Sequence, residues 1–555
     1  MNRRFYLLTT IGVLKLFEKL VSLRRVSTLE TFPEDSLFDA NMIGLFNLLS
    51  VLVLVKLSLE AGGRNVSSQI FFPSGDSFSA SPDFDQLPAV QALDPNDLVA
   101  IRGSSVYETF VDDIIARSTA RLTVKINNLL IAQNGHDDNV LFSPLSITSV
   151  LALVLLGSNG ATFKEISNFW GLQIGIPDID QKSQIVHEQF GRIIKKLNRT
   201  AGFEPGDEVA VASAVFIQDG YPIREIYRST AQEVYQSSIV NVDFQANPYK
   251  AQALINNWVA ERTRNKIKSI LNEAPSGDTR IILASALYFK AEWEQHFFVG
   301  LTKRRPFFVD GRSVSTNLEV DLMANGGEFP YHRDTELGCE ILGLPYKGRK
   351  STMYVVMPFE SSRAKLKEFE SKITEADLSR LVKQTKVTGV VLLMPRMKID
   401  ATLDLKDTLR ALGVRSLFDP SASNLALLSP GQPQLYSNSS NHRASVSDRF
   451  DSFQSIDNIR QLINSESSDN SYQNPGLYAS QVIHKVFMDI TEKGTEAAAA
   501  TAVSLSRDGS RVTFRVDVPF NFFIRHDETD MILFWGSIVV PNPSYKTAQT
   551  TRGGL

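Results

Sequence analysis

The stretch EKGTEAAAAT, residues 492–501, has a composition that suits two backbone conformations. Its four consecutive alanines favour a helix by propensity alone. Gly494 and the small, β-tolerant Thr495 and Thr501 would also let the segment enter a β-sheet without steric conflict. The stretch lies late in the chain, and we therefore expect an exposed segment that can be either loop or strand.

The ten residues resemble the proximal hinge of the reactive-centre loop in inhibitory serpins. Five further blocks resemble serpin blocks and occur in serpin order. They are NVLFSPLSI (139–147), LYFKAEW (287–293), MPRMKIDATLDLKDTL (394–409), VIHKVFMDI (482–490) and DVPFNFFIRHDETDMILFWGSIVVP (517–541). The resemblance covers residues 106–545. It implies an α+β serpin fold with a large central, mostly antiparallel β-sheet, smaller sheets, about eight or nine helices, and an exposed reactive-centre loop at 492–511.

Bulk composition bounds the class of protein. The 555 residues are 43% hydrophobic and 21% charged, enough for a large core. The formal net charge of −3 lacks the excess of lysine and arginine that a nucleic-acid binder needs, so we expect no nucleic-acid partner. The single cysteine, Cys339, excludes an intramolecular disulfide. We expect it to be a small buried hydrophobe.

The first 61 residues hold two apolar runs, at 5–14 and 42–55, and neither reaches the roughly 18 residues of a membrane span. Read from Met42, the second run resembles a secretory signal with cleavage near Ala61; read from Met1, it would be a late signal or a signal anchor. A buried N-terminal helix is the weaker alternative. We expect export and an extracellular, secreted protein.

A polar leader without periodicity follows at 62–105, and we expect it to be disordered. A second tract rich in Ser, Asn and Gln, at 430–475, is expected to be an insertion into the serpin domain, with 546–555 as a tail. The three glycosylation sequons begin at Asn65, Asn198 and Asn438.

Periodicity predicts several elements between these tracts. A helical stripe begins at Val111, and Ser143 is a natural cap for a helix whose first turn holds Pro144. Residues 249–271 predict a strongly amphipathic helix. Residues 208–218, 279–293, 351–358 and 387–395 predict strands, the last two each closed by a proline.

A polar helix carries Arg192, Lys195 and Lys196. By analogy with some serpins this trio would be a glycosaminoglycan site, and a solvated helix face is the stronger interpretation.

We find no motif for a hydrolase, a phosphate-binding loop or a metal site, and expect a protein that is not an enzyme and needs no cofactor or metal. The serpin resemblance implies a different chemistry, in which a protease cleaves the loop and the freed loop inserts into the sheet. In the hinge, Glu492 opens the motif and Gly494 lets the backbone turn. Thr495 would enter the sheet first, and the small side chains of Ala497, Ala498, Ala499 and Ala500 would thread behind it; Glu496 and Thr501 complete the hinge.

The resemblance also assigns positions beneath the sheet. Ser143, Ser146 and His484 match the shutter positions that control sheet opening, and Trp293 matches the aromatic at the upper end of the insertion path. Two residues depart from the common pattern. Ser285 stands where many serpins carry an asparagine, which we expect to loosen the shutter, and Ala291 replaces a frequent glycine.

The commonest loop length puts the cleaved bond after Asp508, and a register one residue shorter puts it after Arg507. Trypsin-like proteases are the more usual extracellular targets, which favours Arg507; Arg511 is a third alternative. We therefore expect a secreted, monomeric inhibitor of a trypsin-like serine protease. The alternative is a non-inhibitory serpin that acts as a carrier, chaperone or structural protein.

Overall fold

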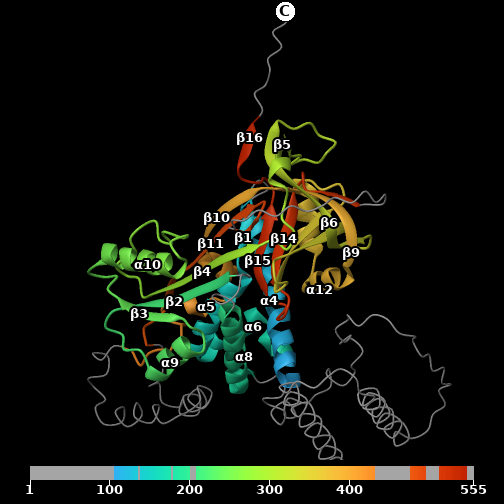
Figure 1. Cartoon of the computed structure of the whole chain (residues 1–555). Coiled ribbons are helices and arrows are strands. Elements are labelled where there is room, and N and C mark those ends of the chain that lie inside the picture. Colours follow the sequence, from blue (N-terminus) through green and yellow to red (C-terminus); the bar gives the residue numbers. More distant parts are fainter. Residues whose placement is uncertain are drawn as a thin grey trace, which may run out of the picture. The chain divides into compact units, whose positions relative to one another are not determined.

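The computed structural model describes residues 105–134, 138–176, 179–199, 208–431, 475–495 and 512–546 (Figure 1). Within these ranges no helix is both long and apolar enough to cross a membrane. The apolar runs before residue 61, the leader, residues 432–474 and residues 547–555 lie outside the described residues.

Ten α-helices occur in the described ranges, against the eight or nine expected. The longest covers residues 105–134 and contains the predicted stripe. Ser143 caps the next helix as predicted, with its Oγ accepting the Ser146 N–H at 3.0 Å. The helices are α4 (Ser105–Asn134), α5 (Pro144–Gly157), α6 (Gly160–Trp170), α7 (Leu172–Gly175), α8 (Ile179–Arg199), α9 (Glu225–Glu233), α10 (Pro248–Arg262), α11 (Arg363–Lys372), α12 (Glu375–Gln384) and α13 (Lys406–Ala411).

A six-stranded sheet holds the predicted strands 208–218 and 279–293, together with the strand that precedes the hinge. The order across the sheet is β10-β11-β12-β4-β2-β3. Two of its pairings, β11 with β4 and β2 with β3, are parallel, and the others are antiparallel. The strands are β2 (Glu208–Gln218), β3 (Ser238–Val242), β4 (Ile281–Glu292), β10 (Met397–Asp404), β11 (Ala479–Thr491) and β12 (Gly494–Thr495).

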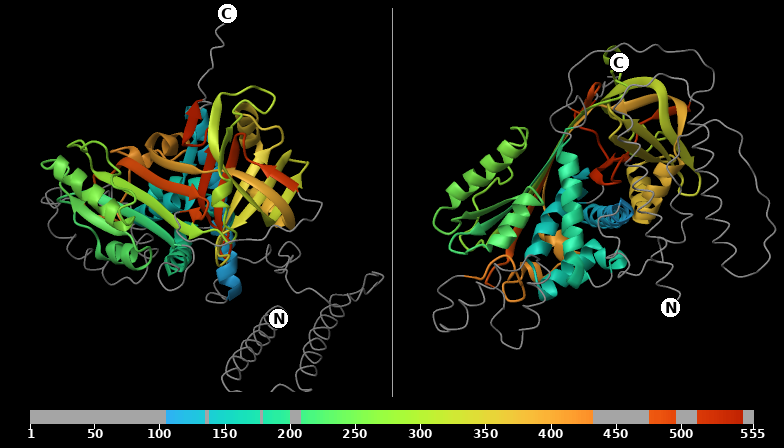
Figure 2. Two further views of the ribbon diagram at one scale, coloured as in Figure 1. Left: turned by 45° about the horizontal axis from the view of Figure 1, so that its top comes forward. Right: turned by 60° about the horizontal axis from the view of Figure 1, so that its bottom comes forward.

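Helices cover both faces of this sheet (Figure 2). Side chains alternate across a strand, so even-numbered residues of β4 such as Ile282 pack with Ile255 of α10 in one hydrophobic cluster. Odd-numbered residues such as Leu283 belong to the main core, which contains α5. The continuous apolar run of β4 is explained by this double cover.

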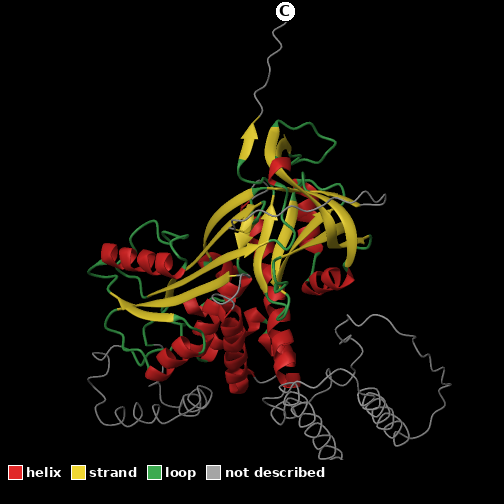
Figure 3. Cartoon of the chain, viewed as in Figure 1, coloured by secondary structure: helices red, strands yellow, loops and turns green. Residues whose placement is uncertain are grey.

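The second sheet has ten strands, and the strands of both sheets are yellow in Figure 3. The smaller sheets that we expected are joined through β6, a strand of 17 residues. Cys339 is fully buried in β7, where burial raises the pKa of its thiol to about 12. The strands are β1 (Val140–Phe142), β5 (Lys303–Pro306), β6 (Leu318–Asp334), β7 (Cys339–Pro345), β8 (Ser351–Pro358), β9 (Lys386–Pro395), β13 (Val512–Arg515), β14 (Phe520–His526), β15 (Ile532–Ile538) and β16 (Ser544–Lys546). Short 3₁₀ turns lie at η2 (Val299–Leu301) and η3 (Ser416–Phe418).

The helix predicted over 249–271 is wrong in its second half. α10 ends at Arg262, and Arg264 and Asn265 adopt positive φ angles that stop the helix. Asn256 Oδ1 accepts the N–H groups of the chain at 270 and 271, each at 2.9 Å. The segment after α10 therefore folds back and buries its isoleucines without being helical, which a helical pattern of apolar residues does not distinguish.

Candidate functional site

The hinge begins as a two-residue strand inside the six-stranded sheet. β12 pairs with β11 on one edge, through Ile490 with Thr495, and with β4 on the other, through Ala291 with Thr495. Beyond β12, β11 and β4 pair directly with each other in parallel, over eight residue pairs from Ala479 with Ile281 to Phe487 with Tyr288. β12 is therefore a wedge at the end of a seam between two parallel strands.

Gly494 is required by the close approach of β4. Its φ is +147°, a region that side chains rarely adopt. A Cβ atom at this position would lie 2.1 Å from the carbonyl oxygen of Ala291 and 2.7 Å from the Cα of Glu292. No larger residue can take this position while β12 stays paired. The glycine predicted to let the chain turn is thus explained by steric room as well as by backbone freedom.

An aromatic pair forms the floor under Thr495. The ring of Trp293 stacks on Tyr346, with centroids 4.5 Å apart and planes 14° apart. The Tyr346 hydroxyl lies 3.1 Å from Thr495 Oγ1, and the Trp293 indole N–H donates to the Thr491 carbonyl at 2.9 Å. Thr495 and both rings are fully buried, so Thr495 has a hydrogen-bond partner and an apolar floor within the sheet.

Glu492 anchors the hinge to the segment that leaves β4. Thr302 Oγ1 donates to Glu492 Oε1 at 2.7 Å, and the Phe297 N–H donates to the Glu492 carbonyl at 2.8 Å. The Trp293 N–H donates in turn to the Lys493 carbonyl at 3.0 Å. These bonds hold the start of the hinge on residues 293–302, a segment followed directly by β5.

Halfway along the seam, His484 of β11 joins β4 to α5. The Ser143 N–H donates to His484 Nε2 at 2.9 Å, which leaves the proton of the neutral ring on Nδ1, and Nδ1 lies 2.8 Å from Ser285 Oγ. His484 is completely buried, and desolvation lowers its pKa to about 3. The ring is therefore neutral at physiological pH and acts as a structural bridge across the seam.

The structure brings together three of the four predicted shutter residues, Ser143, Ser285 and His484. Ser285 reaches His484 with its short side chain, and the expectation that it loosens the shutter stays a prediction. Ser146 is buried, but its hydroxyl has no hydrogen-bond partner among the described residues and only its N–H takes part. Ala291 is buried and pairs with Thr495.

The remaining predicted sites carry less structural information. Arg192, Lys195 and Lys196 of α8 are all exposed, and Lys196 pairs with Glu528 at 2.6 Å, which fits a solvated helix face. Asn198 lies in the last turn of α8. Outside the described residues lie Asn65, Asn438, Glu496, Ala497, Ala498, Ala499, Ala500, Thr501, Arg507, Asp508 and Arg511.

Sequence reasoning missed Tyr346, Thr302 and Thr491. Tyr346 follows β7 and Thr302 follows η2, and neither belongs to a motif near the hinge in sequence. Thr491 could have been noticed because it directly precedes the hinge and bonds back to it, its Oγ1 donating to the Gly494 carbonyl at 2.9 Å.

The whole of this arrangement lies within one family domain. A sequence model of the serpins, described as serine protease inhibitors, matches residues 117–541. The chain belongs to the serpin family. The described part of this serpin extends beyond the matched residues at both ends, by the first turns of α4 and by β16.

Curated relatives agree over most of the chain. This serpin is 31% identical over 475 residues to serine protease inhibitor 28Dc of Drosophila melanogaster, covering 81% of this chain and 84% of the relative. It is 29% identical over 423 residues to human Serpin B4, covering 74% of this chain and 95% of the relative.

Solved structures show the same fold. Serpin48 of Tenebrio molitor matches with a TM-score of 0.60 and 25% identity, over 78% of this chain and 99% of that chain. Human thyroxine-binding globulin in complex with thyroxine matches with a TM-score of 0.63 and 21% identity, over 78% of this chain and 99% of that chain. The second resemblance concerns the fold alone.

Proposed function

We propose that this serpin inhibits a trypsin-like serine protease as a suicide substrate, and does not itself catalyse a reaction. The observation that carries the proposal is the wedge of Gly494 and Thr495, which already pairs with β11 and β4 at the end of their seam. A strand that continues this wedge would separate the two parallel strands and pair antiparallel with both. It would replace one ladder with two, which gives insertion a favourable free energy.

The register of the wedge predicts where later residues would lie. Gly494 faces Glu292 and Thr495 faces Ala291, so each further residue on the inserted strand moves one position back along β4. Continued in this way, Thr501 comes opposite Ser285 on β4 and opposite His484 on β11. Insertion must therefore break the bond between Ser285 and His484, and the Thr501 hydroxyl would arrive to replace it.

Inhibition requires the loop to insert before the acyl ester with the protease hydrolyses. The serine of the protease attacks the carbonyl of the reactive residue, forming an acyl ester and releasing the amine of the following residue. Insertion of about 14 residues at ~3.3 Å each would carry the ester-linked protease ~45 Å before the ester hydrolyses. The small side chains of residues 497–500 favour rapid insertion because they pass between strands with little steric resistance.

The specificity of the inhibitor would depend on the residue at the cleaved bond. Arg507 would enter an acidic specificity pocket through a charged, bidentate contact. Asp508, one residue later, would instead need a protease with a basic pocket. We favour Arg507, and Arg511 is the third alternative.

A direct test is incubation of the protein with trypsin, followed by denaturing electrophoresis and mass spectrometry. We expect a complex that survives SDS, release of the peptide that follows the reactive residue, and a large rise in the melting temperature of the cleaved inhibitor. The mass of the peptide identifies the cleaved bond. Cleavage to free fragments without a gain in stability would favour the alternative of a non-inhibitory carrier, chaperone or structural serpin.

The proposal includes export, on the basis of the apolar run at 42–55 and the sequons at Asn65, Asn198 and Asn438. Expression of the full chain in insect cells should give protein in the medium that loses mass on treatment with a peptide N-glycosidase. Retention in the cell without a change in mass would contradict export and leave the inhibitory proposal standing.

A further inference from the structure

We infer that the surface around β5 is a docking site for an acidic face on the target protease. This surface, the β5 surface, consists of Val299, Leu301, Lys303, Arg304, Arg305 and Val314. The inference deepens the proposed function and rests on it, because it names a second contact between the inhibitor and its protease. It concerns the rate and selectivity of association, and requires no further chemistry.

One end of the β5 surface is hydrogen-bonded to the segment from which the reactive-centre loop starts, which we call its first root. Thr302, between Leu301 and Lys303, donates to the carboxylate of Glu492, and the Phe297 N–H donates to the Glu492 carbonyl. Two residues after Glu492 the chain is fixed in the sheet as β12. The position of β5 relative to the start of the loop is therefore set by hydrogen bonds.

The other end is bonded to the second root of the loop. Arg312, two residues before Val314, donates through Nε to Asp517 Oδ1 at 2.8 Å and through Nη2 to the Arg515 carbonyl at 2.7 Å. Asp517 is fully buried and lies two residues after the end of β13 at Arg515. A protease that holds the loop between Thr495 and Val512 would consequently lie against a surface tied to both roots.

The β5 surface combines positive charge with exposed apolar side chains. All four residues of β5 are exposed, as are Val299 (63%), Leu301 (46%) and Val314 (47%). Among the described residues, Lys303 and Arg305 have no ion pair, whereas Arg304 lies 3.7 Å from Asp321 and over the ring of Tyr545. Apolar side chains beside unpaired cations favour a protein partner with an acidic, partly apolar surface.

The strand position adds to this argument. In Figure 1, β5 lies at the top of the described domain beside β16, and both strands pair with β6. β5 pairs only with β6 among the described strands, so one of its edges is open. Cations on an open edge also discourage unwanted strand pairing, but that role alone would not call for the exposed valines and leucine beside them.

The test compares an anionic and a cationic isoform of trypsin, which share their cleavage specificity and differ in surface charge. For the wild-type protein we expect faster association with the anionic isoform at low salt. The double variant Lys303→Glu, Arg305→Glu should lose about tenfold in this rate and associate faster than the wild-type protein with the cationic isoform. The number of inhibitor molecules consumed per protease and the melting temperature should not change.

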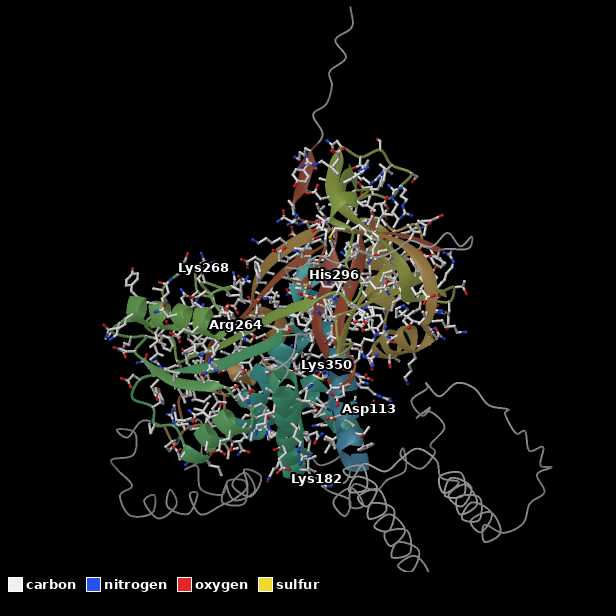
Figure 4. All side chains as sticks on the ribbon, in the orientation of Figure 1. Asp113, Lys182, Arg264, Lys268, His296 and Lys350 are labelled. Atoms are coloured by element: carbon white, nitrogen blue, oxygen red, sulfur yellow. The ribbon has the colours of Figure 1, made fainter. Side chains whose placement is uncertain are left out.

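A matched control separates a local effect from a change in net charge. Lys250→Glu, Lys268→Glu introduces the same charge change at exposed positions on and after α10, where Figure 4 labels Lys268, and should leave the ratio of the two rates unchanged. Equal responses of the two isoforms, or the same shift in the control, would overturn the inference while covalent complexes still form. So would loss of binding to a sulfated polysaccharide in the Lys303/Arg305 variant with no change in the trypsin ratio. Failure to form a covalent complex with either isoform would overturn the proposed function as well.

Discussion

The wedge and the middle of the seam hold the same two strands in different ways. At the wedge, β11 and β4 are separated by Gly494 and Thr495, and the contacts are made by the aromatic pair Trp293 and Tyr346. At the middle, the strands pair directly, and a single neutral imidazole bonds to Ser285 and to the Ser143 N–H. Two residues of β12 lie between β11 and β4 at the wedge, and none lies between them at the middle.

Separating β11 from β4 must break side-chain bonds as well as the backbone pairing between the two strands. A strand that grows from the wedge passes the aromatic pair without disturbing it, because Thr495 already occupies that site. It then meets His484, whose bond to Ser285 on β4 is lost when β11 and β4 separate. Buried polar groups that lose a partner each cost about 1–3 kcal/mol. If the loop inserts as proposed, we expect the middle of the seam to resist its insertion more than the wedge does.

The largest expected effect comes from blocking the wedge. Thr495→Arg puts a cation where the wild-type side chain is fully buried, and we expect the covalent complex with trypsin to fall by more than 100-fold while cleavage continues. Electrophoresis under denaturing conditions measures both products. Thr513→Arg, at an exposed position on β13, is the matched control and should inhibit normally. Full inhibition by Thr495→Arg would contradict insertion through the wedge.

The next effect concerns the shutter. His484→Ala removes a buried ring and leaves the Ser143 N–H and Ser285 hydroxyl without their partner, so we expect a loss of roughly 3–5 kcal/mol in the free energy of unfolding. Urea unfolding followed by tryptophan fluorescence measures it. His526→Ala removes another buried histidine, with one side-chain bond to Thr529, and should cost less than half as much. Equal losses in the free energy of unfolding would mean that the His484 bridge stabilises the protein no more than an ordinary buried histidine.

Much of this comparison could be predicted from the sequence. The apolar run of β4 predicted a strand, the resemblance to the serpins implied the role of His484 in the shutter, and the cap at Ser143 followed from its position before Pro144. Periodicity within each strand also puts Ser285 on the same face as Leu283 and Leu287, which pack in the core with α5. These features depend on local patterns, which a sequence displays directly.

The rest depends on contacts between distant segments. Tyr346 reaches Thr495 over 149 residues and Thr302 reaches Glu492 over 190, and no motif announces either pair. The segment after α10 was mistaken for helix because its buried isoleucines fit a helical spacing while Asn256 holds it in another conformation. The pairing of Gly494 and Thr495 within the sheet also depends on contacts with distant segments, because the composition of the hinge suits loop and strand equally.

The contribution of His484 to the pH dependence of stability can be isolated by a substitution elsewhere in the core. Glu370 of α11 is buried against Asn127, Asn521 and Ser537, and desolvation raises its pKa to about 7. Between pH 4.5 and 7 the unfolded chain loses this proton first, so stability falls as pH rises, by about 3 kcal/mol at ~1.4 kcal/mol per pKa unit. His484 has the opposite effect, because its folded pKa of about 3 lies below the ordinary 6.5 and stability is lost as pH falls below 6.5.

Glu370→Gln should therefore stabilise the protein by about 3 kcal/mol at pH 8 relative to its effect at pH 4.5, since the neutral amide carries no cost of ionisation. Its N–H group can also donate to Asn127 Oδ1 or Asn521 Oδ1, which have no partner among the described residues. With Glu370 removed, the rise in stability from pH 4.5 to 6.5 that His484 causes should become steeper. Urea unfolding across this range measures both, and a pH-independent effect of the substitution would contradict the ionisation of Glu370.

The smallest expected effect concerns a contact that a strand growing from the wedge would make at the middle of the seam. If insertion continues the register of the wedge, Thr501 reaches Ser285 and His484, and its hydroxyl replaces the bond that insertion breaks. Thr501→Val keeps the shape of the side chain and removes that hydroxyl, so the cleaved, inserted form should lose about 1 kcal/mol relative to the uncleaved form. Ser504→Ala, three positions further along and opposite Ile282 in the same register, removes a hydroxyl away from the shutter and should leave this difference unchanged. An equal loss in both variants would mean that the inserted strand does not keep the register set by Gly494 and Thr495.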